Sequence, residues 1–131
     1  MRIAHGIDIV SVKRITSAIQ RGGDAFLKRV FTKAEADFCR GRARQFEHYA
    51  ARFAAKEAFI KALGDRAHAV ALNQIEVCKQ SSGKPYLALS AAVLKSAGLS
   101  RKTVIELSLS HERDFAVASV ILVSPERTRA L

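Results

Sequence analysis

The stretch FEHYAARFAAKEAFIKALG, residues 46–64, predicts the longest helix of this protein and is the part of the sequence from which the fold is worked out. The helix is expected to run from about Phe46 to Leu63 and to end at Gly64, because a glycine suits a left-handed C-terminal cap. At about 100° per residue, a single apolar stripe forms along it and is expected to face the core. The members of this stripe are Phe46, Tyr49, Ala50, Phe53 and Ile60.

Glu57 falls in the middle of that stripe. Burying a carboxylate on a core-facing surface lowers the stability of the fold by roughly several kcal/mol unless a cation compensates the charge. An ion pair with Lys61, four residues further on, supplies one such cation, and a bound metal supplies another. Lys56 lies about 100° from Glu57 on the helix and is either solvated or supports the site. The pattern alone leaves these alternatives open.

Asp8 raises the same question in the N-terminal stretch RIAHGIDIV, residues 2–10, which predicts a β-strand. It interrupts an apolar run between Ile7 and Ile9. Strand alternation by itself favours an Asp8 side chain that points to solvent. Two carboxylates with few other ligands are, however, the usual protein contribution to a magnesium site, so Asp8 and Glu57 together suggest a metal.

The remaining pattern predicts an α+β fold in one domain, residues 1–131, with an antiparallel sheet and a long central helix. A first helix is expected after an N-cap at Ser11 and to stop at Gly22-Gly23. A second should begin at Thr32, which forms a capping box with Glu35, and fade near Gly41. Strands are expected at 74–79, 86–89, 104–109 and 116–123, with a short helix at 91–97 between the second and third.

The net charge of +10 indicates an anionic partner, which nucleic acid, a membrane surface, a polyphosphate ligand or an acidic protein would each satisfy. Cys39 and Cys78 lie far apart, so a disulfide framework or zinc site is not expected. The longest apolar run, residues 115–123, is too short to span a bilayer, and no secretory signal is evident at the N-terminus. The predicted location is cytoplasmic, without membrane attachment.

Several segments resemble one enzyme family. Arg52–Gly64 is similar to the signature helix of the 4′-phosphopantetheinyl transferases, in the form found in bacterial holo-acyl-carrier-protein synthases. Gly6–Val10 resembles the metal-binding segment near the N-terminus of that family. Phe31–Glu35, Ser82–Tyr86 and Ser108–His111 follow in the family's order. Because these segments are spread over nearly the whole chain, the resemblance is specific.

The resemblance implies an enzyme with the phosphopantetheinyl transferase fold that moves 4′-phosphopantetheine from coenzyme A to a serine of an apo acyl carrier protein. Adenosine 3′,5′-bisphosphate would be the leaving group. Asp8 and Glu57 would hold Mg²⁺ against the pyrophosphate of coenzyme A, and Lys61 would reach a phosphate as a point charge. These three residues are the expected catalytic set.

Further contacts to coenzyme A follow from the resemblance alone. Ser110 and His111 would bind it, although an isolated loop histidine is more often an ordinary surface residue. Gly83, Lys84 and Pro85 would lie near the nucleotide, although on their own they form an ordinary hairpin turn. The resemblance also implies a homotrimer with active sites between neighbouring subunits.

Carrier docking is assigned to Arg14, Arg21 and Lys28, because carrier proteins of this kind are small and acidic; a solvated basic face is the alternative. The general base stays unassigned between Glu35, whose capping-box role explains it equally well, and a metal-oriented water. Two competing hypotheses remain. One is a basic module that binds RNA without catalysis, although no nucleic-acid motif is present, and the other is a carrier-binding subunit that has lost its metal.

Overall fold

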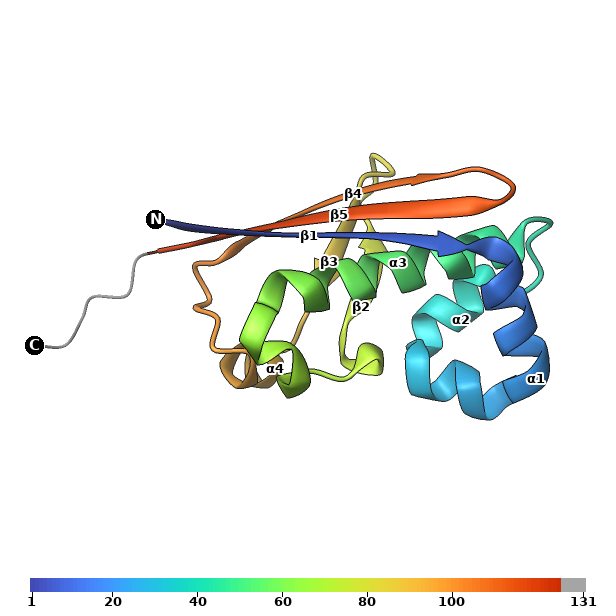
Figure 1. The fold of residues 1–131 in the computed structure, drawn as a ribbon, viewed down its shortest axis with the longest axis horizontal. Helices are drawn as coiled ribbons and strands as arrows, with labels where there is room; N and C mark the ends of the chain where they lie inside the picture. Colours follow the sequence, from blue (N-terminus) through green and yellow to red (C-terminus); the bar gives the residue numbers. More distant parts are fainter. Residues whose placement is uncertain (126–131) are drawn as a thin grey trace, which may run out of the picture.

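Three antiparallel strands form the main sheet, in the order β1–β5–β4 (Figure 1). The computed structural model describes residues 1–125. In it, β1 spans Arg2–Ser11, β4 spans Val104–His111 and β5 spans Phe115–Ser124. A tight connection joins β4 to β5, whereas β1 reaches β5 from the other end of the chain and pairs with it along its whole length. The predicted α+β class with an antiparallel sheet and a long helix is confirmed.

The long helix, α3 (Gln45–Leu63), lies against one face of this sheet (Figure 1). Its closest approach is at Gly6 of β1, where an added Cβ would lie 1.9 Å from the carbonyl oxygen of Ala58. A glycine on the strand and small residues on the helix therefore bring the two backbones together. The stripe predicted to face the core is in part wrong, because Phe46, Phe53 and Ile60 are only half buried. The deeply buried face of α3 is made largely by alanines, at positions 50, 51, 54, 55, 58 and 62.

Helix α1 (Val12–Val30) follows β1 directly, and Ser11 accepts a hydrogen bond from the backbone N–H of Arg14 as its N-cap. The helix does not stop at Gly22-Gly23, as the pattern predicted. Gly23 adopts φ 56° and ψ −145°, which only glycine tolerates readily, and the chain then resumes helical structure to Val30. The glycine pair thus produces a kink rather than an end, because the residues after it still have an apolar side to bury.

The remaining helices lie on the same side of the sheet as α3, and a small hairpin runs up beside β4 (Figure 1). Helix α2 (Lys33–Cys39) begins with the predicted capping box of Thr32 and Glu35. After α3 come two 3-10 turns, at Gly64–Ala69 and Leu72–Gln74, and a hairpin of β2 (Glu76–Lys79) and β3 (Pro85–Ala88). A short helix, α4 (Ala91–Ser96), leads to β4. Within residues 1–125, none of the helices has the length and apolar character needed to cross a membrane.

The sheet face turned away from α3 is apolar, and we call it the outer face. Side chains that neighbour one another in the strand register point to the same side, and on this side many large apolar residues are exposed. They are Ile3, Ile7, Ile9, Val104, Phe115 and Ile121, with 39% to 66% of each residue exposed. A surface of this kind is typical of a contact with another protein or another copy of the chain.

Candidate active site

Asp8 faces α3, not solvent. The inward residues of β1 are the even-numbered ones, so Gly6, Asp8 and Val10 point toward the helix while Ile7 and Ile9 lie on the outer face. Only 14% of the Asp8 side chain is exposed. The expectation from alternation alone was wrong, because the odd-numbered residues of β1, Ile7 and Ile9 among them, are the exposed ones.

Glu57 meets Asp8 across the close contact between α3 and β1. Burial raises the pKa of the Glu57 carboxyl above its ordinary value, the negative charge of Asp8 raises it further, and Lys61 opposes both. Within residues 1–125, no hydrogen bond to the Glu57 carboxylate is found. Glu57 is therefore a partly buried carboxylate beside a second carboxylate, and its charge is poorly compensated by the chain.

Lys61 binds Asp8 and does not form the i,i+4 ion pair with Glu57. Its Nζ atom lies 3.0 Å from Asp8 Oδ1 and 3.1 Å from the carbonyl oxygen of Ile7. An ammonium group has three donors, so one remains for a ligand, and 55% of the Lys61 side chain is exposed. The site combines two acids and one mobile cation.

The chemistry of this donor set suits Mg²⁺. Magnesium is usually bound by one or two carboxylates, with waters and substrate phosphates in its other positions. Asp8 and Glu57 supply two carboxylates that converge from a strand and a helix, and Glu57 has no competing hydrogen bond. No cluster of three or more His, Cys, Asp or Glu side chains that could hold a metal occurs in the described residues.

An open groove of about 670 Å³ begins at Asp8 and Glu57 and runs between α1 and α3. Arg14 and Arg21 line its α1 wall, and Phe53 lines its α3 wall. Phe26, from the segment after the kink, closes it further along. Lys28 is exposed but is not among the residues that line this groove. The structure thus brings two of the three predicted docking residues to the acidic pair.

Ser110 and His111 lie on the opposite edge strand of the sheet from Asp8. They end β4, and β5 separates that strand from β1. His111 Nδ1 is 3.5 Å from Glu47 Oε1, and the rings of His111 and His48 are 5.8 Å apart, both partners belonging to the first turn of α3. In a single protomer, these residues are not part of the same constellation as Asp8 and Glu57.

Sequence reasoning assigned no role to Arg52, which forms a basic cluster with Arg42 and Lys79 around the ring of Phe38. The three cationic groups lie 4.2, 3.8 and 4.9 Å from the ring centroid, respectively. Arg52 is 4% exposed and its Nε atom has no hydrogen-bond partner among the described residues. Such a buried donor without a partner is unusual.

His48 lies beside this cluster and packs edge-on against Phe38, with ring centroids 5.5 Å apart. Burial lowers the pKa of His48, and the charges of Arg52 and His111 lower it further. An arginine between the alanines and phenylalanines of a core helix was the available signal in the sequence. His111 adjoins this cluster through His48. His111, which the sequence predicted as a binding residue, and Arg52, which it did not, therefore lie in the same region.

The turn with Gly83, Lys84 and Pro85 joins β2 to β3, and Gly83 adopts φ 88°. Lys84 Nζ lies 3.3 Å from Glu106 Oε2 on β4, with both side chains more than half exposed. The hairpin therefore sits at the β4 side of the molecule, like His111, and away from the β1 edge. A contact between this turn and the nucleotide of coenzyme A remains a prediction.

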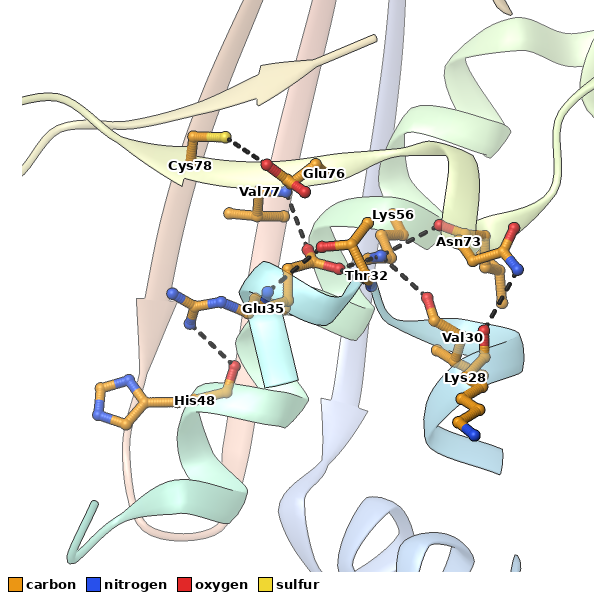
Figure 2. Close-up of polar contacts among 12 residues, drawn as sticks. Lys28, Val30, Thr32, Glu35, His48, Lys56, Asn73, Glu76, Val77 and Cys78 are labelled. Atoms are coloured by element: carbon orange, nitrogen blue, oxygen red, sulfur yellow. Dashed lines mark hydrogen bonds and ion pairs between the residues drawn. The ribbon is translucent and has the colours of Figure 1, made fainter. Parts of the chain in front are cut away.

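Glu35 is enclosed and fully engaged, which removes it as a base for an incoming hydroxyl. It is 1% exposed; Oε1 accepts from the backbone N–H of Thr32 at 2.9 Å, and Oε2 accepts from that of Val77 at 2.9 Å (Figure 2). Oε1 also accepts from Lys56, which is completely buried. Burial lowers the pKa of Lys56, and Glu35 opposes this shift. The alternative of a solvated Lys56 is thus wrong.

Comparison with known proteins identifies the family. The model of the 4′-phosphopantetheinyl transferase superfamily matches residues 4–120. The chain belongs to this superfamily. A holo-[acyl-carrier-protein] synthase of Desulforudis audaxviator is 45% identical over 129 residues, covering 98% of both chains. A second, from Geobacter sulfurreducens, is 43% identical over 129 residues, covering 95% of this chain and all of that one.

Solved structures of holo-acyl-carrier-protein synthases have the same fold as this chain. The holo-(acyl-carrier-protein) synthase of Bacillus anthracis, in complex with coenzyme A (3′,5′-ADP), is 34% identical with a TM-score of 0.74, covering 93% of this chain and 96% of that one. The Chronobacterium ammoniagenes ACPS–CoA complex has a TM-score of 0.82 at 29% identity, covering 96% and 100%. The predicted family, fold and enzyme class are confirmed: this phosphopantetheinyl transferase has holo-[acyl-carrier-protein] synthase activity, the transfer of phosphopantetheine from coenzyme A to an apo acyl carrier protein.

Proposed function

We propose that the transfer takes place at the β1 edge of the sheet, where Asp8 and Glu57 hold Mg²⁺. The observation that carries this assignment is the convergence of two carboxylates, one of them without a hydrogen-bond partner and with a raised pKa. When bound, the metal supplies charge neutralisation at the pyrophosphate that is cleaved. Asp8 and Glu57 orient that group from a strand and a helix whose spacing is set by Gly6.

Lys61 assists at the same pyrophosphate. Its ammonium is anchored by Asp8 and by the carbonyl of Ile7, and the remaining donor is free to bind a phosphate oxygen. This second cation would offset negative charge on the leaving group as the phosphorus–oxygen bond breaks. Lys61 would therefore stabilise the departing nucleotide, while Asp8 and Glu57 would hold the metal that neutralises the reacting phosphate.

The groove between α1 and α3 receives the carrier protein. Arg14 and Arg21 line it and offer positive charge to an acidic surface, and Phe26 and Phe53 add apolar contact area. The groove opens directly onto Asp8 and Glu57, so a serine of a protein seated there would reach the phosphate. Lys28, exposed further along α1, would contribute long-range attraction more than direct contact.

The nucleotide end of coenzyme A is assigned to the basic cluster and its neighbours. The unpaired Nε of Arg52, with Arg42 and Lys79 beside it, suits a phosphate, and His111 and Ser110 border the same region from the end of β4. Gly83, Lys84 and Pro85 lie on this side of the sheet as well. Solved structures of related synthases in complex with coenzyme A support such a ligand.

Because this cluster and the acidic pair lie on different sides of α3, the complete site requires two copies of the chain. A separation of five residues places Arg52 and Glu57 about 140° apart around the helix. The exposed apolar outer face provides a surface through which copies would associate, and we assign it to a homotrimer. Each active site would then combine Asp8 and Glu57 of one protomer with His111 and Arg52 of a neighbour.

The activity test is direct. Purified protein is mixed with coenzyme A, Mg²⁺ and an apo acyl carrier protein, and the carrier is weighed by mass spectrometry. We expect the mass of one phosphopantetheine to be added, and we expect chelation of the metal to stop the reaction. Unchanged turnover after thorough chelation would remove the metal from the proposal, and no mass gain across several carriers would remove the carrier reaction.

The shared site has its own test. Glu57→Gln and His111→Ala proteins are each expected to be inactive, and they are unfolded together and refolded as a mixture. In a head-to-tail ring, random assembly restores an intact pair of neighbours at about a quarter of the interfaces, so activity should return to that level. If both halves of the site came from one protomer, the mixture would show no more activity than the separate variants. Light scattering on the same samples reports the oligomeric state.

A further inference from the structure

The buried pair Glu35–Lys56 links the segments that flank the groove (Figure 2). Lys56 Nζ donates to the carbonyl oxygen of Val30, the last residue of α1, at 2.9 Å. It also donates to the carbonyl oxygen of Leu72 at 3.1 Å and to Glu35 at the start of α2. One ammonium group thus joins the end of α1, the start of α2 and a 3-10 turn to α3.

Every hydrogen-bonding position of this ammonium is used, which fixes where α3 can sit. An ammonium has three donors, and Lys56 has three acceptors, none of them replaceable by water because the residue is 0% exposed. In the low dielectric of the interior, a displaced donor would lose its partner at high cost. The pair therefore tolerates little rotation or translation of the helix.

The rest of the buried face of α3 does not impose the same restriction. Its alanines, among them Ala54, Ala55 and Ala58, let the helix approach the sheet closely but do not interlock with it. Its large apolar side chains, Tyr49, Phe59 and Leu63, make contacts that lack the fixed direction of hydrogen bonds. Rotation of the helix by about 10° would move a carboxylate about 6 Å from its axis by about 1 Å. A displacement of that size can lower the rate of a catalysed reaction by on the order of a hundredfold.

Glu57 directly follows Lys56 in α3, so the fixed lysine sets the direction of the catalytic carboxylate. We infer that Glu35 and Lys56 are positioning residues for the transfer reaction: they hold α3 in the rotation that aims Glu57 at Asp8, and they hold the end of α1 against α3 so that the groove keeps its width. This inference rests on the proposed metal-binding role of Glu57. Neither residue touches a substrate, since both are enclosed.

The test uses the double variant Glu35→Gln/Lys56→Met. It removes both buried charges, keeps similar side-chain volumes and retains a glutamine for the capping box, so it is expected to fold. We expect kcat to fall by roughly ten- to a hundredfold, the Mg²⁺ concentration for half-maximal rate to rise, and KM for coenzyme A to change little. The measurements are made on folded protein, well below its unfolding temperature.

The control is Leu99→Ala, a core truncation beyond α4 that touches neither the pair nor the groove. It should lower the unfolding temperature and leave kcat and the Mg²⁺ requirement of the folded protein unchanged. A folded double variant with wild-type kcat and wild-type Mg²⁺ requirement overturns the inference. If the double variant does not fold, the single variant Glu35→Gln is measured in the same kinetic assay. A wild-type kcat for Glu35→Gln would also overturn the inference. Loss of activity in Glu57→Gln is measured alongside, so that failure of the metal site itself is recognised separately.

Discussion

Two lysines of α3 each pair with a carboxylate from another element, and the two pairs differ in burial and in hydrogen bonding. Lys61 pairs with Asp8 at a half-exposed position, beside a Glu57 whose carboxylate has no hydrogen bond within the described residues. Lys56 pairs with Glu35 in full burial, with all donors of the ammonium satisfied. Satisfied, buried charges cannot take part in chemistry but define geometry, whereas exposed, under-satisfied charges remain free for a metal and a phosphate. The helix uses consecutive residues, Lys56 and Glu57, for these two purposes.

The largest expected effect concerns the under-satisfied side of this comparison. Glu57→Gln should lower turnover by at least about a hundredfold, because it removes one of two carboxylates that hold the metal. The variant should still fold, since the residue is only half buried and its carboxylate has no hydrogen bond to lose within the described residues. Carrier mass gain and thermal unfolding are measured in parallel, with the exposed Asp65→Asn as a charge-matched control. A wild-type rate in Glu57→Gln would make the carboxylate structural.

The same substitution at the two lysines should produce opposite results. Lys56→Met leaves Glu35 buried and unpaired, so the free energy of unfolding should fall by about 3–5 kcal/mol. Lys61→Met breaks a half-exposed pair and should change it by less than about 1 kcal/mol. Turnover should nevertheless fall strongly in Lys61→Met, through loss of a phosphate contact. Denaturant unfolding and steady-state kinetics on both variants test the contrast, which equal stability losses would contradict.

A smaller effect is expected on the groove wall. Arg14→Glu should raise KM for an acidic carrier by roughly fivefold and weaken the dependence of this KM on salt, because it removes an attractive charge that salt would otherwise screen. KM for coenzyme A should not change. Arg101→Glu, an exposed reversal of the same charge outside the groove, serves as the control. Equal losses for both substrates would argue against a docking role for Arg14.

The smallest effect is a dependence of stability on pH. Because the pKa of Glu57 is raised from its ordinary 4.5, the folded protein holds this proton more tightly than the unfolded chain does. The resulting stabilisation is complete below the ordinary value and is lost as pH rises through the folded pKa. In the presence of a metal chelator, Glu57→Gln should therefore unfold at a higher temperature than the wild type near neutral pH. This difference in unfolding temperature should become smaller as the pH is lowered.

Thermal unfolding from about pH 4 to about pH 8 would show this divergence. Added Mg²⁺ should then stabilise the wild type alone, because only that protein retains both carboxylates. Parallel curves for the two proteins, with and without the metal, would mean that Glu57 is neither perturbed nor a ligand.

Much of the architecture could be predicted from local pattern. The capping box at Thr32 and Glu35 and the end of α3 at Gly64 depend on residues close in sequence, and both are confirmed. The kink in α1 was mistaken for an end, since a glycine pair does not reveal whether the chain beyond it has a surface to pack on. The core-facing stripe of α3 was wrong in part, because a helix covered on several sides has no single apolar face.

The sequence by itself determined the family, the acidic residues Asp8 and Glu57 as candidates, and the need for an anionic partner, since motif identity and charge are properties of the linear chain. Only the tertiary structure decided that Asp8 faces α3, that Lys61 binds Asp8, and that Lys56 is sealed against Glu35. It also set Arg52 and His111 apart from the acidic pair. The physical reason is that burial and pairing join residues distant in sequence, and no local pattern encodes which side of a strand or helix the rest of the chain will cover.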